Sequence, residues 1–199
     1  MKKFKLTSEF IVDISGVKLF RIKALIEFGN VKAGDLGGYI EKEENLSHMG
    51  DAWVSDDARI SGNAQVFGNA QVFGDAQVFG DAWVSGNARV SGDTQVFGDA
   101  RVFGNAWVSG NARVFGDAQV FGDARVSGDK DYAYAHGFGS CNRTTTFFRL
   151  KDGDVGVRCG CFYGTLAQFR DKVCETHGET KKAQEYLMLA DLMEIRFKN

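Results

Sequence analysis

The chain has 199 residues, a formal net charge of -2 and 44 % hydrophobic residues, enough for one substantial domain with attachments, which excludes a wholly disordered chain. The nearly balanced charge gives no reason to expect nucleic acid or an anionic membrane as a partner. The N-terminal stretch alternates apolar and polar residues, and no later run approaches the roughly 20 apolar residues that span a bilayer. We therefore expect a cytoplasmic protein with reduced cysteines.

The chain opens with a predicted β-hairpin. Its strands are IVDI and KLFRIKAL, which alternate apolar and polar faces and are joined by a Ser-Gly turn. We assign residues 1–34 to an N-terminal β cap.

From Gly50 to Ser127 the sequence repeats G-[N/D]-A-x-V-[F/S] every six residues. Repeats this short cannot be helical units, so they predict a β-solenoid, which we assign to residues 35–127. Alternation along a strand turns the alanine and valine inward and the variable Gln, Arg or Trp outward. Gly-Asn and Gly-Asp tolerate positive φ and are the predicted corners, three to a coil of about 18 residues.

The first coil is irregular. Ile40, Leu46 and Ala52 are six residues apart, so we place all three at the alanine phase, with Lys42 and His48 where valine would stand. Charged residues at those positions predict a degenerate capping coil, which a solenoid end needs in order to avoid open-edge pairing.

Taking every eighteenth residue sorts the outward side chains into ladders. Two ladders of phenylalanine are predicted oligomer interfaces, because contiguous apolar patches mark contact surfaces: Phe79, Phe97 and Phe115, and Phe67, Phe103 and Phe121. The alternative is that the terminal segments cover one ladder and that stacked rings stabilise successive strands. Arg beside Trp suits stacking on a base and pairing with phosphate, which makes a set of candidate binding residues: Trp53, Trp83, Trp107, Arg89, Arg101 and Arg113.

Residues 128–199 predict a C-terminal module of a hairpin and two helices. A crossing segment, DYAYAHGFGSCN, precedes the hairpin TTTFFRLKDGDVGVRCGCF, which turns at Asp152-Gly153. Thr165 is the predicted N-cap of LAQFRDKVCETHG, which ends at Gly178, and KKAQEYLMLADLMEIRF forms the second helix. The predicted fold is therefore mainly β, a single-stranded solenoid with an N-terminal β-hairpin cap and a C-terminal ββαα module.

Two kinds of metal site come into question, although no cofactor is expected. The zinc candidates are Cys141, Cys159, Cys161 and Cys174 with His136 and His177, but C-x-C replaces the usual C-x₂-C, and buried thiols are the alternative. Corner carboxylates could hold Ca²⁺ along two edges, or stand there because Asp accepts the corner conformation: Asp57, Asp75 and Asp93, and Asp81, Asp99 and Asp117.

The repeat resembles that of hexapeptide-repeat, left-handed β-helix proteins, in which an aliphatic residue is followed four positions later by a small one. Val66 to Ala70 and Val72 to Ala76 match it, whereas the Phe after many valines departs from it and keeps a right-handed solenoid open. The flanks LFRIKALIEFGNVKAGDLGGYIE and CGCFYGTLAQFRDKVCETHG resemble those of phage and prophage proteins, often labelled polymer-forming or putative transferase. This resemblance implies a bacterial host and favours a homotrimer.

Three functions follow as hypotheses. The first is a non-enzymatic oligomeric binding or scaffold protein, which antagonises a host protein or sequesters a small nucleotide signal. The second is a hexapeptide-repeat acyltransferase, for which His136 or His48 would have to be the catalytic base. The third is a phage structural or filament-forming protein.

Overall fold

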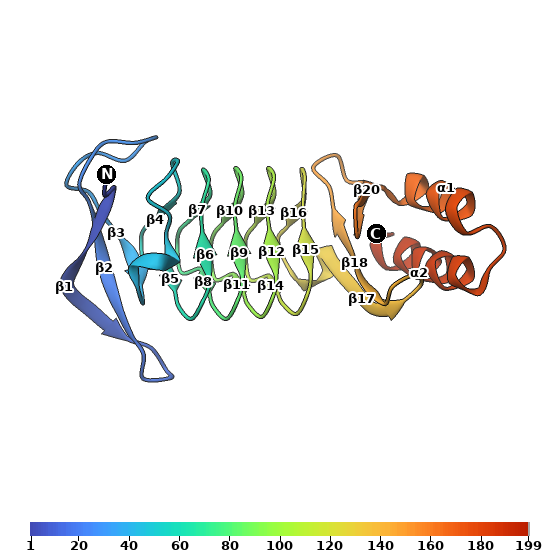
Figure 1. Ribbon diagram of the computed structural model, residues 1–199, viewed down its shortest axis with the longest axis horizontal. Helices are drawn as coiled ribbons and strands as arrows, with labels where there is room; N and C mark the ends of the chain where they lie inside the picture. Colours follow the sequence, from blue (N-terminus) through green and yellow to red (C-terminus); the bar gives the residue numbers. More distant parts are fainter. Residues whose placement is uncertain (199) are drawn as a thin grey trace.

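The repeats form very short parallel strands, each made of one outward residue and the valine or isoleucine that follows it. In the computed structural model, which describes residues 1–198, these strands are stacked along a rod (Figure 1). They are β4 (Trp53–Val54), β5 (Arg59–Ile60), β6 (Gln65–Val66), β7 (Gln71–Val72), β8 (Gln77–Val78), β9 (Trp83–Val84), β10 (Arg89–Val90), β11 (Gln95–Val96), β12 (Arg101–Val102), β13 (Trp107–Val108), β14 (Arg113–Val114), β15 (Gln119–Val120) and β16 (Arg125–Val126).

Every third strand along the chain pairs in parallel, so the rod has three faces. Face 1 holds β5, β8, β11 and β14, face 2 holds β4, β7, β10, β13 and β16, and face 3 holds β6, β9, β12 and β15. Val66 pairs with Val84, and the N–H of Phe67 donates to the carbonyl of Val84 at 3.0 Å. The predicted parallel β-solenoid with an 18-residue coil is thus confirmed.

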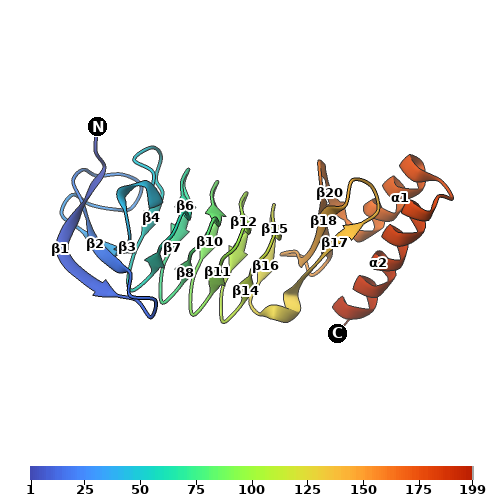
Figure 2. The same cartoon turned by 60° about the horizontal axis from the view of Figure 1, so that its bottom comes forward.

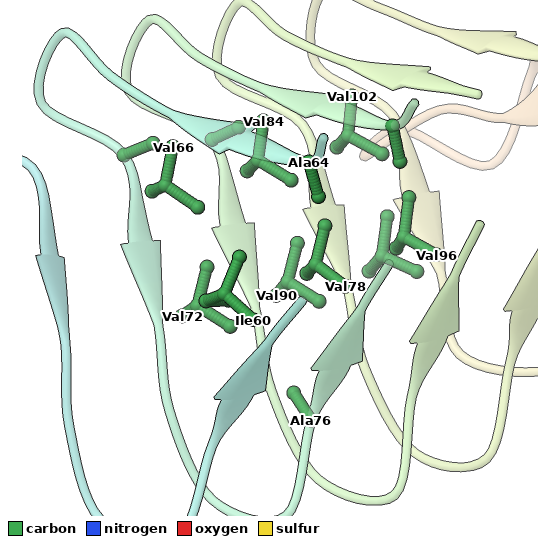
Figure 3. Close-up of a cluster of buried hydrophobic side chains, with 14 of the residues drawn as sticks. Ile60, Ala64, Val66, Val72, Ala76, Val78, Val84, Val90, Val96 and Val102 are labelled. Carbon is green, nitrogen blue, oxygen red and sulfur yellow. The ribbon is translucent and has the colours of Figure 1, made fainter. Parts of the chain in front are cut away.

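The interior is a column of mostly small apolar side chains. Repeat alanines and valines such as Ala64, Val66 and Val84 are fully buried, and Figure 3 shows the valines of neighbouring coils side by side inside the rod. Thr94 stands in an alanine position, where its hydroxyl donates to the carbonyl of Ser91 at 2.6 Å. The close-packed interior favours apolar side chains, mostly Ala and Val, and a buried polar group such as the Thr94 hydroxyl needs a hydrogen-bond partner.

The phase predicted for the first coil is wrong. Ile40 pairs with Ile60 and Leu46 with Val66, so both stand at the valine position, 20 residues before their partners. The two additional residues follow Leu46, because the next valine position, Val54, comes eight residues later instead of six. Before Leu46 the chain forms a single 3₁₀ turn, η1 (Glu43–Asn45). Asn45 is fully buried there, and its amide donates to the carbonyl of Ala64 at 2.8 Å, which a repeat alanine could not do.

The N-terminal hairpin is confirmed and closes one end of the rod. Strands β1 (Phe4–Val12) and β2 (Lys18–Ala24) are antiparallel, and β2 pairs with β3 (Leu36–Ile40), which continues in parallel into β5. Buried Phe4 and Ile22 join the solenoid core at this end.

The other end is covered by a larger module than predicted. The segment expected to cross over is itself a strand, β17 (Tyr132–Phe138), preceded by a 3₁₀ turn, η2 (Asp129–Asp131). With β18 (Arg143–Arg149), β19 (Val155–Cys159) and β20 (Phe162–Thr165) it makes a four-stranded antiparallel sheet. The strand was missed because YAYAHGF lacks a clear apolar–polar alternation, and its pairing with β18 decides its conformation.

Two helices complete the module on the far side of this sheet from the solenoid (Figure 2). As predicted, α1 (Leu166–His177) begins after Thr165, whose hydroxyl accepts from the N–H of Gln168, and ends before Gly178. The second helix, α2 (Lys181–Phe197), packs with α1 over a core that contains Phe147 and Phe169. In residues 1–198 neither helix is long and apolar enough to cross a bilayer.

Candidate functional site

Face 3 carries a continuous row of aromatic and cationic side chains, which we call the aromatic stripe: Phe67, Trp83, Arg101, Phe103 and Phe121. The ring of Phe67 meets that of Trp83 edge-on, with centroids 6.0 Å apart. The guanidinium of Arg101 lies over the indole of Trp83, 4.8 Å from the centroid of that ring. Phe103 and Phe121 follow, with centroids 4.4 Å apart.

The stripe begins at a groove and ends against the C-terminal module. The groove, about 500 Å³ in volume, lies between the first coil and Trp83, and Glu43 and His48 form part of its wall. At the other end Tyr163 meets Phe121 edge-on at 4.7 Å, and Arg158 lies 5.4 Å from the centroid of the same ring. Sequence reasoning missed Arg158 and Tyr163 because neither belongs to the repeat.

In this groove both ring nitrogens of His48 and one face of its ring contact other residues. Its Nδ1 accepts from the N–H of Lys3 at 3.2 Å, so its Nε2 carries the proton that is donated to Glu43 at 2.6 Å. Its ring stacks on Phe4, and the ammonium of Lys2 is 2.8 Å from the carboxylate of Glu43. Hydrogen bonds from Lys2 and His48 lower the pKa of Glu43.

His136, the other histidine expected to act as a base, lies on the open surface. Its side chain is 59 % exposed, and its Nδ1 is 2.9 Å from the hydroxyl of Thr144 and 3.7 Å from the carboxylate of Asp117. The two candidate bases therefore lie at opposite ends of the rod, and they share no cavity.

Face 1 carries the second phenylalanine ladder. Phe79 and Phe97 are stacked with parallel rings at 4.9 Å, and Phe97 and Phe115 are stacked at 5.3 Å. Tyr134 of the C-terminal module meets Phe115 edge-on at 5.8 Å. Because the rings lie face to face along the rod, they present their edges to solvent, and each ring supports its neighbour in the next coil.

The predicted binding residues are spread over all three faces. Trp83 and Arg101 contact each other on face 3, Trp107 and Arg89 stand exposed on face 2, and Arg113 is on face 1. The indole N–H of Trp107 donates to the hydroxyl of Ser91 at 3.2 Å.

Trp53 was wrongly expected to be an outward binding residue. Its side chain is only 7 % exposed, because the segment between β2 and β3 folds over it. The ring of Phe28 meets the indole edge-on at 5.4 Å. The repeat pattern gives no sign of this burial, since Phe28 lies outside the repeats.

The expected metal candidates do not come together. Within residues 1–198 no group of three or more His, Cys, Asp and Glu side chains is arranged to hold a metal ion. Cys159 and Cys161 line one small cavity with His177, whereas Cys141 and Cys174 are exposed elsewhere in the module. Of the aspartates considered for Ca²⁺, Asp81 instead accepts a hydrogen bond from the side-chain amide of Asn63 at 3.1 Å.

Comparison with known proteins agrees with this architecture. The repeats are similar to the family described as YdcK beta solenoid repeat, with matches over residues 58–74, 76–92, 82–96, 94–110 and 106–120. The chain is a repeat β-solenoid protein. No curated protein matches it. The matches lie within residues 58–120, inside the solenoid, and include neither terminal module.

Proposed function

We propose that this β-solenoid is a non-enzymatic oligomeric binding or scaffold protein that contacts its partners through the aromatic stripe of face 3. One observation carries the proposal. Trp83 is 41 % exposed although Phe67 and Arg101 already hold its ring in place. A large ring that is fixed before binding loses little entropy on contact, and Trp and Arg dominate the binding energy of protein interfaces.

The geometry of the stripe favours a protein surface over a nucleotide base as the partner. A base stacked on Trp83 would have to displace the guanidinium of Arg101, which lies over that ring. An apolar side chain of a protein could instead pack against the exposed edge of the indole and against Phe67 and Phe103, which are only partly buried. We propose further copies of this chain as the first such partner, assembled as a trimer.

The same proposal includes the finer features that the sequence resemblance implies. They are a left-handed hexapeptide helix, a prophage origin, residence in the cytoplasm of a bacterial host, and a host protein as the final target of the assembly. The held position of His48 supports a binding role for the groove, because both its ring nitrogens already have protein partners. A base that serves acyl transfer needs one ring nitrogen free to reach the substrate.

The test is the mass of the protein in solution, measured by light scattering over a dilution series. We expect Trp83→Ala with Arg101→Ala to weaken self-association by about 30-fold or more, corresponding to about 2 kcal/mol for a central Trp–Arg pair. Trp107→Ala is the matched control, because Trp107 is 39 % exposed but lies on face 2. A monomeric wild type, or equal effects of the two variants, would count against the proposal.

A further inference from the structure

The C-terminal module contains a cavity of about 210 Å³ that the solenoid does not touch. It lies where the turn between β19 and β20 approaches helices α1 and α2, next to the loop that joins β17 to β18. Its lining includes both basic and apolar side chains.

Arg143 and Lys172 bring positive charge to the lining, which also includes the imidazole of His177, and no Asp or Glu lines the cavity. Lys172 pairs with Glu175 at 2.8 Å on the helix surface outside it. Within residues 1–198 the guanidinium of Arg143 has neither a hydrogen bond nor an ion pair with another side chain. The guanidinium of Arg143 therefore brings to the cavity a positive charge with unused donors, and no carboxylate in the lining neutralises it.

The apolar lining residues include Phe162, Phe169 and Val173. The rings of Phe162 and Phe169 lie 5.5 Å apart, and Phe169 and Val173 are almost fully buried in the core of the module. A rigid apolar wall opposite a few polar groups is typical of small-molecule sites, because the wall supplies affinity and the polar groups fix orientation.

Hydrogen bonds fix Tyr186, which also lines the cavity, and the loop that precedes β18. The hydroxyl of Tyr186 accepts from the N–H of Ser140 at 3.0 Å, and the N–H of Gly139 donates to the carboxylate of Glu185 at 2.7 Å. Burial raises the pKa of Tyr186, so its hydroxyl stays protonated at neutral pH. These contacts hold the loop that precedes Arg143, the first residue of β18, against the helices, so the cavity is formed before any ligand arrives.

We propose that this cavity binds a small organic anion, with its carboxylate or phosphate at Arg143 and its apolar body against Phe162 and Phe169. The volume suits a single six-membered ring with one acidic group. Lys172 adds a second cation to the lining, and a carboxylate or a phosphate would meet the planar guanidinium through two parallel hydrogen bonds. The site is independent of the stripe on face 3.

Benzoate and phenyl phosphate are suitable probes, titrated into the full chain and followed by calorimetry and by NMR shifts of the C-terminal module. We expect both to bind, and Arg143→Gln to weaken them at least tenfold. Lys5→Gln is the control, since Lys5 is an exposed cation in β1, at the opposite end of the rod from the cavity. The tighter of the two probes identifies the preferred head group.

Several outcomes would overturn the proposal. If benzyl alcohol bound as tightly as benzoate, the anionic head group would play no part. If inorganic phosphate bound as tightly as phenyl phosphate, the apolar wall would be irrelevant. Equal affinities of Arg143→Gln and Lys5→Gln, with circular dichroism spectra like that of the wild type, would place binding elsewhere. Absence of binding at 10 mM probe, roughly the weakest affinity of interest, would remove the site.

Discussion

We expect the protein to become more stable as the pH rises from about 8 to 10.5, because of one buried lysine. Lys3 is 1 % exposed, its ammonium donates to the carbonyls of Ala52 at 2.7 Å and Gly50 at 3.2 Å, and it lies 4.6 Å from the ring centroid of Phe28. Burial lowers the pKa of Lys3 from 10.5 to about 8, and Asp51 opposes this shift only in part.

The direction of the effect follows from proton binding. Below about pH 8 Lys3 is charged in both the folded and the unfolded chain, so its contribution is constant. Between about 8 and 10.5 the unfolded chain binds more protons than the folded one, and stability therefore increases with pH. Such a pKa shift corresponds to about 3 kcal/mol at most.

Urea unfolding of the wild type and of Lys3→Met across this pH range would measure the effect. The difference between their free energies of unfolding should increase with pH, since other titrating groups cancel. Tyr132, whose pKa is raised by burial, is one such group and acts in the opposite direction above pH 10. Lys2→Met, which removes an exposed charge next to Lys3 in sequence, should keep the wild-type slope. Parallel curves for the wild type and Lys3→Met would refute the expectation.

The second large effect concerns the corner of the solenoid. Gly86 has φ of +68°, and a Cβ there would lie 2.9 Å from the backbone nitrogen of Gly104 in the next coil. We expect Gly86→Ala to cost about 2 to 5 kcal/mol, the sum of a left-handed conformation and a clash with backbone that cannot move aside. Chemical unfolding followed by far-UV circular dichroism would measure the cost.

Two further variants separate the conformation from the clash. Gly16→Ala, at φ of +86° with no atom near the added Cβ, should cost only about 1 to 2 kcal/mol. Gly86→Asp should be milder than Gly86→Ala, because Asp56 occupies a corner at φ of 56° and accepts from the N–H of Gly74 at 3.0 Å. If alanine cost the same at positions 16 and 86, contact between coils would not be the reason for glycine at the corners.

The candidate site was only partly predictable. The 18-residue spacing placed Trp83 and Arg101 on one face, because partners in adjacent coils are fixed by the period of the repeat. It could not show that Arg101 lies over the Trp83 ring, nor that Phe28 buries Trp53. Both depend on side-chain packing, and the second involves a segment outside the repeats.

The sequence by itself determined the solenoid, its inward alanines and valines, and its glycine corners. Each of these is set within six residues by strand alternation and allowed backbone angles, and then repeated. Only the tertiary structure decided the 20-residue spacing of Ile40 from Ile60, the strand β17, and the cavity at Arg143. Those features arise from contacts between segments far apart in the chain, where local preferences are weak and packing chooses among several alternatives.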